Sequence, residues 1–584
     1  MYKILSKING PEDVKKLSID ELKLLSNDIR EALFNRLTKI GGHCGPNFGI
    51  VEAEIAMHYV FSSPVDKFVF DVSHQSYPHK MLTGRRLGYT DEEYFKDDSG
   101  YTNPNESEHD LFNVGHTSTS ISLASGLAKA RDVAGRKENV VALIGDGSLS
   151  GGEALEALNV AGSEIKSNLI IIVNDNQQSI SETHGGIYEN LKLLRESNGT
   201  ASNNLFKAFN LDYVYEENGN DIESLIKLFK KVKDIDHPIV VHINTLKGKG
   251  FKLAETNKEE WHWTMPFDRE TGKKKFSFTG ESYVQIAHDF IMAKAENDKN
   301  FVVVTPNMPS SVGLSKQDRD TLGLQFVDVG IAEEQAVAIA SGLAKGGVTP
   351  IVVTNTTFIQ RAYDQIHQDL CINNNPATIL LNYSSFDGLT DVTHLGIFGV
   401  SMLSNIPNLV TLAPTCKSEF VNMLNYSVTQ KKHPTVILIP GGAVTDRETS
   451  DNFDNFNYVV ENEGSKVAII ALGDFYSKGL DLTKEIENKL GFKPTLINPR
   501  FASVVDAALL KKLEANHKLI ITLEDGILDG GFGQKIASNL GTTSLKVKNY
   551  GLERKFYDRY NPADLLKELN MTTSQIIEEI KSIL

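Results

Sequence analysis

The sequence predicts an α/β protein with parallel sheets. Short runs of β-branched and other apolar residues alternate with helix-length segments along the whole chain of 584 residues. Such runs are typical of strands buried on both faces, which occur in parallel sheets covered by helices. They are also far shorter than a membrane span. The runs occupy residues 140–144, 169–173, 238–243, 301–305, 350–354, 378–381, 435–439, 466–472 and 519–524.

Chain length and two changes in composition predict three domains. A single core rarely serves so many residues, because domains usually contain about 50–250. A polar, basic stretch at 271–277 and a polar stretch at 446–457 interrupt the alternation of strands and helices. We therefore predict domains at 1–272, 280–448 and 458–584.

Composition narrows the class of protein and its partners. The formal net charge is −15, which argues against nucleic acid or an anionic membrane as a partner but allows a local basic pocket for a phosphorylated substrate. The three cysteines, Cys44, Cys371 and Cys416, are widely spaced, which favours a reducing compartment. The N-terminal segment lacks the apolar core of a signal peptide. We expect a cytoplasmic protein that acts on small molecules.

Two motifs at neighbouring strand ends predict a metal–diphosphate site. Gly145-Asp146-Gly147 follows the strand at 140–144 and precedes a helix, and Asn174-Asp175-Asn176 follows the strand at 169–173. Glycines allow backbone N–H groups to approach a phosphate, and a helix N-terminus favours its negative charge. Carboxylate and amide oxygens suit Mg²⁺. Each motif alone is an ordinary turn. Their combination matches the signature of thiamine-diphosphate enzymes.

Over nearly its whole length the chain resembles the 1-deoxy-D-xylulose-5-phosphate synthase family of transketolase-like enzymes. The segments that carry the resemblance are 41–52, 58–86, 107–122, 140–162, 174–181, 330–344 and 357–369, including HQSYPHKMLTGRR at 74–86. The resemblance implies a homodimer and three domains: a diphosphate- and Mg²⁺-binding domain, a pyrimidine-binding domain and a C-terminal transketolase domain. It also implies an enzyme that uses thiamine diphosphate and Mg²⁺ to join pyruvate, with loss of CO₂, to glyceraldehyde 3-phosphate.

The resemblance assigns cofactor roles to individual residues. Asp146 and Asn176 would bind Mg²⁺, with a backbone carbonyl near Gln178. Glu333 would hydrogen-bond the aminopyrimidine ring and favour the tautomer that deprotonates the thiazolium ring, although a Glu that opens a helix more often only stabilises the helix dipole. Phe358 would stack on the pyrimidine and Ile180 would wedge the cofactor, and both are also common core residues. The remaining predicted contacts are His74, Gly115, His116, Thr117, Gly147, Ser148, Asn176 and Phe251.

Three histidines and an arginine complete the predicted site. His43 in GGHCG, His262 in EEWHWTMPFD and His394 in DVTHLG match active-site histidines of the family. Imidazole can move protons on and off carbonyl oxygens near neutral pH. Arg361, in FIQRAYDQ, matches an arginine that binds the acceptor's phosphate in the family.

The residues expected to bind the acceptor aldehyde depart from the family pattern. Tyr383 stands where the family usually has Arg, and Leu438 and Gly441 lie where it has a Tyr-Pro-Arg-Gly signature preceded by a further Arg. An Arg–phosphate contact is worth roughly 1.5–3 kcal/mol, so a phosphorylated acceptor is expected to bind more weakly. The segment 185–209 is shorter than the mobile active-site cover of the family, so closure over the cofactor is expected to differ.

Three functions stay open at this point. The first is the synthase reaction, and the second is a related carboligase with a different aldehyde acceptor, either phosphorylated or unphosphorylated. The third is a non-catalytic regulator that binds thiamine diphosphate, which is disfavoured because Asp146, Asn176, Glu333 and His43 are retained. No G-x-G-x-x-G follows an early strand, which disfavours a dinucleotide-dependent dehydrogenase. The metabolic pathway, whether isoprenoid synthesis, thiamine synthesis or sugar salvage, stays open as well.

Overall fold

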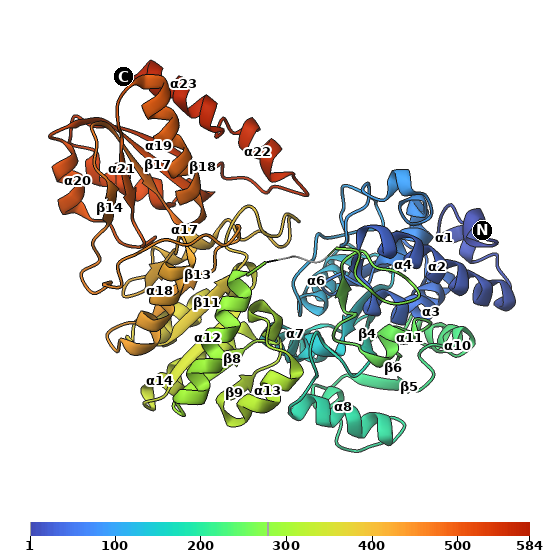
Figure 1. The fold of residues 1–584 in the computed structure, drawn as a ribbon. Helices are drawn as coiled ribbons and strands as arrows, with labels where there is room; N and C mark the ends of the chain where they lie inside the picture. The colour runs from blue at the N-terminus through green and yellow to red at the C-terminus, as the bar shows by residue number, and fades with distance from the viewer. Residues whose placement is uncertain (1, 277–279) are drawn as a thin grey trace. The chain divides into compact units, whose positions relative to one another are not determined.

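The fold is that of a computed structural model, which describes residues 2–276 and 280–584. The chain divides into two compact units, Met1–Thr279 with Gly330–Ala332, and Gly280–Val329 with Glu333–Leu584. Unit 1 contains one large sheet and unit 2 contains two (Figure 1). The predicted α/β class with parallel sheets is confirmed. The boundaries at 272/280 and 448/458 stay predictions, and residues 277–279 of the first linker lie outside the described residues.

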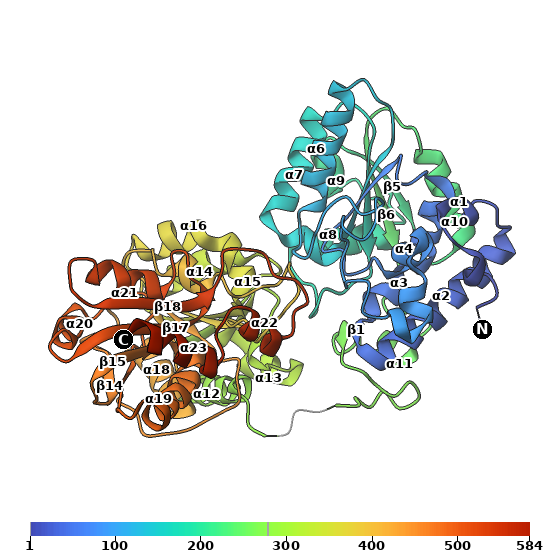
Figure 2. The ribbon, with the colours of Figure 1, turned by 90° about the horizontal axis from the view of Figure 1, so that it is seen from above.

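The sheet of unit 1 has five parallel strands in the order β2-β3-β4-β6-β5. Side chains alternate between its two faces, and both faces are covered by helices. Val141 and Ile172 contribute to the core under α2, α3 and α10, whereas Ile144 and Ile171 contribute to the core under α6 and α7. The helices α6 and α7 lie side by side (Figure 2).

The elements of unit 1 follow the alternation that the sequence predicts. The strands are β2 (Lys67–Phe70), β3 (Val140–Gly145), β4 (Leu169–Asp175), β5 (Asp212–Glu216) and β6 (Pro238–Asn244), with a small antiparallel pair β1 (Gly42–His43) and β7 (Trp263–Thr264). The longer helices are α2 (Ile19–Ile40), α3 (Gly45–Val60), α6 (Ser120–Val133), α7 (Gly152–Glu164), α8 (Gly186–Glu196) and α10 (Ile222–Val232). The shorter ones are α1 (Pro11–Val14), α4 (Tyr77–Lys80), α5 (Leu87–Thr90), α9 (Leu205–Ala208) and α11 (Lys252–Thr256).

Local capping explains where several helices begin. Ser18 and Glu21 form a capping box at the start of α2, and the Asp221 carboxylate accepts the N–H of Ser224 at 2.9 Å at the start of α10. These side chains satisfy backbone N–H groups that have no partner within the helix. The same residues in the middle of a helix would compete with it.

The first sheet of unit 2 is parallel throughout, in the order β12-β13-β11-β10-β8-β9. Its strands are β8 (Phe301–Thr305), β9 (Phe326–Asp328), β10 (Thr349–Asn355), β11 (Thr378–Asn382), β12 (Val410–Leu412) and β13 (Thr435–Leu438). Its helices are α12 (Tyr283–Asn297), α13 (Lys316–Leu322), α14 (Glu333–Lys345), α15 (Thr356–Ile359), α16 (Tyr363–Gln365), α17 (Gly399–Leu403) and α18 (Lys417–Thr429). The helices α12 and α18 cover one face, and α14 covers the other.

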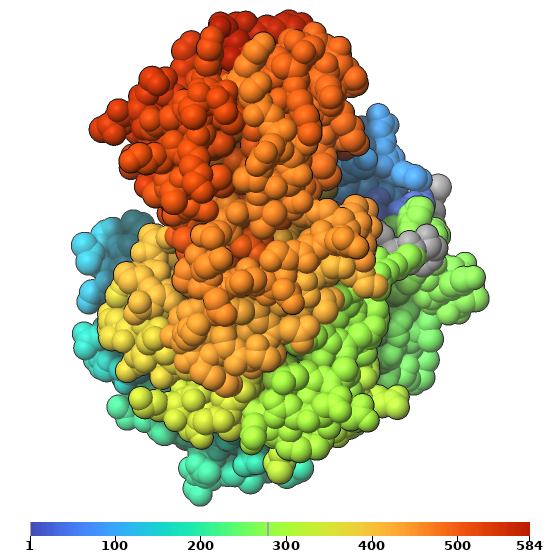
Figure 3. Space-filling model, turned by 60° about the vertical axis from the view of Figure 1, so that its left-hand side comes forward, coloured from blue at the N-terminus to red at the C-terminus, as the bar shows by residue number. Residues whose placement is uncertain are grey.

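The second sheet of unit 2 has the order β14-β16-β15-β17-β18, in which only β14 is antiparallel to its neighbour. Its strands are β14 (Val459–Asn462), β15 (Lys466–Ala471), β16 (Thr495–Asn498), β17 (His517–Ile527) and β18 (Lys546–Leu552). Its helices are α19 (Tyr476–Leu490), α20 (Ala507–Leu513), α21 (Phe532–Leu540), α22 (Pro562–Glu568) and α23 (Thr573–Ile583). Apolar side chains of the two sheets share one core, and Figure 3 shows their segments, yellow-green to red, as one continuous surface. Among the described residues, no helix combines the length and apolar character that a membrane span needs.

A buried chain of polar side chains fixes the loop at 98–119 in unit 1. His58 Nε2 lies 2.9 Å from His79 Nδ1, and His79 Nε2 lies 3.0 Å from Asp110 Oδ1. Arg85 donates to both carboxylate oxygens of Asp110, at 2.7 and 2.8 Å. Burial lowers the pKa of His79 to about 4, so its imidazole is neutral at pH 7 and Arg85 balances the charge of Asp110.

We predict that Asp110→Asn destabilises the protein by about 3–5 kcal/mol, because Arg85 would lose its main counterion inside the fold. Chemical denaturation of the full chain measures this loss. The matched control is Glu223→Gln, which breaks the exposed ion pair with Lys23 and is expected to cost less than about 1 kcal/mol. Equal losses in the two variants would contradict the role given to the buried pair.

Candidate active site

The two predicted metal ligands follow neighbouring strand ends in unit 1. The strands β3 and β4 pair in parallel, with Gly145 opposite Asn174, so Asp146 and Asn176 leave the sheet at the same edge. Both are buried, with 2% and 8% of their surfaces exposed. The N–H of Gln178 donates to Asp146 Oδ2 at 3.2 Å and so joins the two loops. The three residues predicted to hold the metal are thus brought together.

The donor set fits a hard cation. Burial, with the nearby charge of Asp175, raises the pKa of Asp146 to about 8. The amide oxygen Oδ1 of Asn176 is buried and accepts no hydrogen bond. A buried carboxylate and an unsatisfied amide oxygen are both stabilised by a divalent cation that prefers oxygen ligands. Among the described residues there is no cluster of three or more His, Cys, Asp or Glu side chains that could hold a metal.

The turn after β3 packs tightly against two other loops. A Cβ atom at Gly147 would lie 2.7 Å from Ser179 Oγ, so only glycine allows this approach. The Ser118 hydroxyl donates to the backbone carbonyl of Ser148 at 2.8 Å. This contact brings the segment 115–117, with the predicted residues Gly115, His116 and Thr117, beside the Gly147–Ser148 turn.

Three of the predicted histidines cluster in unit 1. The ring centroids of His43, His74 and His262 lie 5.2–5.7 Å apart. Burial lowers the pKa of His262 well below its ordinary value, and the nearby Lys247 lowers it further. His262 is therefore neutral at pH 7, with Nδ1 lying 3.0 Å from Lys247 Nζ.

Two lysines near this site were missed by the sequence analysis. Lys247 is fully buried and donates to the carbonyl of Ser179 at 2.6 Å, and burial lowers its pKa to about 7. Lys258 donates to the carbonyl of Asn176 at 3.0 Å. Lys247 could have been predicted from the sequence, because it follows β6 closely and parallel strands such as β3, β4 and β6 end at the same edge of the sheet. Lys258 lies in a polar loop and carried no comparable signal.

The other two predicted residues of unit 1, Ile180 and Phe251, have different surroundings from each other. Ile180 is half-buried in the loop after β4, and its carbonyl accepts a hydrogen bond from Gln178 Nε2 at 3.3 Å. Phe251 is 6% exposed and is surrounded by the aromatic rings of Phe34, Phe48, Trp261 and Phe267. This environment gives Phe251 a packing role, and its cofactor contact stays a prediction.

Unit 2 carries the remaining predicted residues in two pairs. Glu333 opens α14 with 2% of its surface exposed, and its Oε2 accepts no hydrogen bond. Arg361 Nη1 lies 3.6 Å from that oxygen. Burial raises the pKa of Glu333 to about 7, and Arg361 opposes the shift. Phe358 and His394 form the second pair, with ring centroids 5.5 Å apart, and burial lowers the pKa of His394 to about 4.

Acidic residues occupy the place in unit 2 where the family pattern has arginines. Leu438 is buried, and the N–H of Gly441 donates to Asp474 Oδ2 at 2.7 Å. Burial raises the pKa of Asp474 to about 6, and burial together with Asp474 raises that of Asp525 to about 8. Both line a small cavity of about 20 Å³, and among the described residues that line it none is Lys or Arg.

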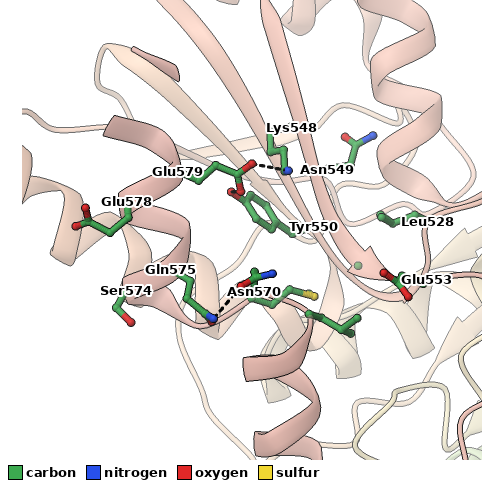
Figure 4. Close-up of a pocket in the computed structure, with 13 residues that line it drawn as sticks. Leu528, Lys548, Asn549, Tyr550, Glu553, Asn570, Ser574, Gln575, Glu578 and Glu579 are labelled. Atoms are coloured by element: carbon green, nitrogen blue, oxygen red, sulfur yellow. Dashed lines mark hydrogen bonds and ion pairs between the residues drawn. The ribbon is translucent and has the colours of Figure 1, made fainter. Parts of the chain in front are cut away.

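A larger cavity, of about 650 Å³, lies elsewhere in unit 2, between β18 and α23 (Figure 4). Lys548 and Glu579 form an ion pair of 2.5 Å at its wall, and Gln575 donates to Asn570 at 3.0 Å. None of the predicted site residues lines this cavity.

Four family models match segments of this chain, and together they cover most of both units. Residues 5–203 match the 1-deoxy-D-xylulose-5-phosphate synthase profile. Residues 114–301, 282–445 and 457–576 match the thiamine diphosphate binding, pyrimidine binding and C-terminal domains of transketolase. These matches define an enzyme of the transketolase class, which uses thiamine diphosphate with a divalent metal.

Full-length relatives define the family more closely. The chain is 37% identical to the 1-deoxy-D-xylulose-5-phosphate synthase of Alkaliphilus oremlandii (strain OhILAs), over 100% of this chain and 99% of the relative. It is 35% identical to that of Clostridium tetani (strain Massachusetts / E88), over 100% of both chains. The chain belongs to the 1-deoxy-D-xylulose-5-phosphate synthase family.

Solved structures of transketolases are more distant. The enzyme from Campylobacter jejuni subsp. jejuni NCTC 11168 is 16% identical, with a TM-score of 0.44, over 97% of this chain and 100% of that chain. The family assignment therefore depends on the sequence relatives.

We predict that Asp146→Asn weakens the binding of thiamine diphosphate at limiting Mg²⁺ by at least about tenfold, because a neutral amide is a poorer ligand for a hard cation than a carboxylate. Calorimetric titration at several Mg²⁺ concentrations measures the loss, which excess Mg²⁺ is expected to reduce. The control is Asp320→Asn, an exposed residue of α13. A cofactor affinity unchanged at every Mg²⁺ concentration would remove Asp146 from the metal site.

Proposed function

We propose that the protein condenses pyruvate, with decarboxylation, with glyceraldehyde 3-phosphate to give 1-deoxy-D-xylulose 5-phosphate. The observation that carries the proposal is the pair of buried oxygen ligands at adjacent strand ends, the Asp146 carboxylate and the unsatisfied Asn176 Oδ1. Mg²⁺ held there by these groups and by a backbone carbonyl near Gln178 would bind a diphosphate. Membership of the synthase family supports the reaction itself.

The cofactor defines what the protein must supply. Thiamine diphosphate, when bound, provides a thiazolium carbon that adds to a carbonyl carbon after losing its proton and then accepts the electron pair released by decarboxylation. Gly147, Ser148 and the segment 115–117 would surround the diphosphate, where backbone N–H groups can donate to it. Phe358 would contact the pyrimidine ring.

Glu333 would hold a proton on the aminopyrimidine ring. Its unsatisfied, buried Oε2 is able to share a proton with a ring nitrogen, and its pKa near 7 places it where either protonation state is accessible. Arg361, 3.6 Å away, limits how far that pKa rises. The pair therefore fits a group that moves a proton rather than one that only stabilises the helix.

The predicted active-site histidines would donate protons to substrate oxygens and accept protons from them. His262 is kept neutral by burial and by Lys247, so it can accept a proton, and His43 lies beside it. His394 is likewise kept neutral by burial. The resemblance further supports a homodimer in the cytoplasm, and light scattering of the purified protein tests the dimer.

We predict that Glu333→Gln lowers kcat by at least about a hundredfold, in the range of a lost general acid–base group. The affinity for thiamine diphosphate with Mg²⁺ is expected to change little, since Asp146 and Asn176 are untouched. The matched control is Glu334→Gln, the next residue of α14. Turnover of Glu333→Gln equal to that of the control would show that Glu333 has no catalytic role.

A second candidate function differs in the acceptor. The Asp474 carboxylate at the N–H of Gly441, with the apolar Leu438 nearby in sequence, favours an unphosphorylated aldehyde, because negative charge at this loop repels a phosphate. The two candidates share the first half-reaction. They are distinguished by the ratio of kcat/KM for glyceraldehyde 3-phosphate to kcat/KM for glyceraldehyde.

We predict that Asp474→Asn increases this ratio severalfold, since the variant removes the charge but keeps an oxygen that can accept the Gly441 N–H. Steady-state assays with both aldehydes measure it, with Asp481→Asn, on the exposed side of α19, as the control. If Asp474→Asn leaves the ratio unchanged, this loop does not face the phosphate end of the acceptor.

A further inference from the structure

The helix α8 presents one face to the core of unit 1 and to the ends of β3 and β4. Leu191 and Leu194 are buried in the core shared with α6 and α7. Tyr188 and Arg195 are seven positions apart, which places them on the same side of the helix, two turns from each other. The helix therefore directs two polar side chains, at fixed spacing, toward the edge of the sheet that carries the metal ligands.

Tyr188 contacts the turn after β3. Its hydroxyl donates to the backbone carbonyl of Gly147 at 3.1 Å, and the Ser150 hydroxyl donates to the same carbonyl at 2.9 Å. Gly147 directly follows Asp146. The hydrogen bond from α8 thus restrains the Gly147–Ser148 peptide, in the turn that Asp146 begins.

Arg195 contacts the end of β4. Its guanidinium forms an ion pair with Asp175, whose side chain is fully buried and directly precedes Asn176. Asp175 also lies 2.9 Å from His242 Nε2 and accepts the N–H of Gln177 at 3.2 Å. The Asp175 carboxylate therefore orients the loop that carries Asn176 and Gln178, and Arg195 supplies its charge partner.

We propose that Tyr188 and Arg195 are positioning residues that fix both strand ends and thereby set the affinity for the metal–diphosphate group. The helix α8 then connects the loop after β3 to the loop after β4. The inference rests on the proposed function, because it needs thiamine diphosphate and Mg²⁺ to bind at Asp146 and Asn176. Polar groups that orient metal ligands typically change metal affinity 10–100-fold when they are removed.

Calorimetric titration of the full-length protein with thiamine diphosphate at fixed Mg²⁺ tests the proposal. We expect Tyr188→Phe, which keeps the ring, to weaken binding about fivefold, in line with one hydrogen bond. Arg195→Met is expected to weaken it about 10–100-fold. Arg195→Lys is expected to recover part of that loss, because it restores the charge. Lys192→Ala, an exposed residue of the same helix, is the control and is expected to bind as the unmodified protein does.

The melting temperature without cofactor and kcat at saturating cofactor separate positioning from plain packing. Positioning predicts that Tyr188→Phe loses affinity while both of these quantities stay near those of Lys192→Ala. Affinity unchanged in both Tyr188→Phe and Arg195→Met, with only the melting temperature lowered, would overturn the inference and leave the proposed function intact. An unmodified protein that takes up no thiamine diphosphate would overturn both.

Discussion

The site depends on the parallel pairing of β3 with β4. Because Gly145 lies opposite Asn174, the residues that follow each strand leave the sheet at the same edge, where the N–H of Gln178 donates to Asp146 Oδ2 at 3.2 Å. Asn176 Oδ1 accepts no hydrogen bond, and burial raises the pKa of Asp146 to about 8 although its carboxylate accepts the N–H of Gln178. A divalent cation bound by these groups would recover the free energy that burial costs them. We therefore expect the fold to hold these oxygen ligands in place before the metal binds.

Glu333 shows the same principle in unit 2. It is buried at the start of α14 with one oxygen unsatisfied, and Arg361 lies near enough to limit the rise of its pKa but too far to donate a hydrogen bond. Buried ionisable groups of this kind cost stability and are typical of functional sites. By contrast, both carboxylate oxygens of the buried Asp110 accept hydrogen bonds from Arg85, which suits a structural role.

The sequence was sufficient to predict the central strands and most of the residues that gather around the strand ends. All nine apolar runs lie within or overlap strands, because central strands are buried on both faces and must be apolar. The strands it missed include β5 and β18, which lie at sheet edges and carry polar residues, and β9 and β12, which are very short. Lys258 and Tyr188 were missed as site neighbours because their proximity comes from loop and helix placement that no local pattern encodes. Phe251 fitted a motif, yet aromatic packing explains its position as well.

We propose above all that Asp146 and Asn176 jointly bind the metal of a metal–diphosphate group. The most direct measurement is the anomalous scattering of Mn²⁺ in crystals of the protein grown with thiamine diphosphate and Mn²⁺ in place of Mg²⁺. We expect a single strong peak within bonding distance, about 2.0–2.3 Å, of the Asp146 carboxylate and Asn176 Oδ1. A bound cofactor whose metal lies against other residues would contradict the claim.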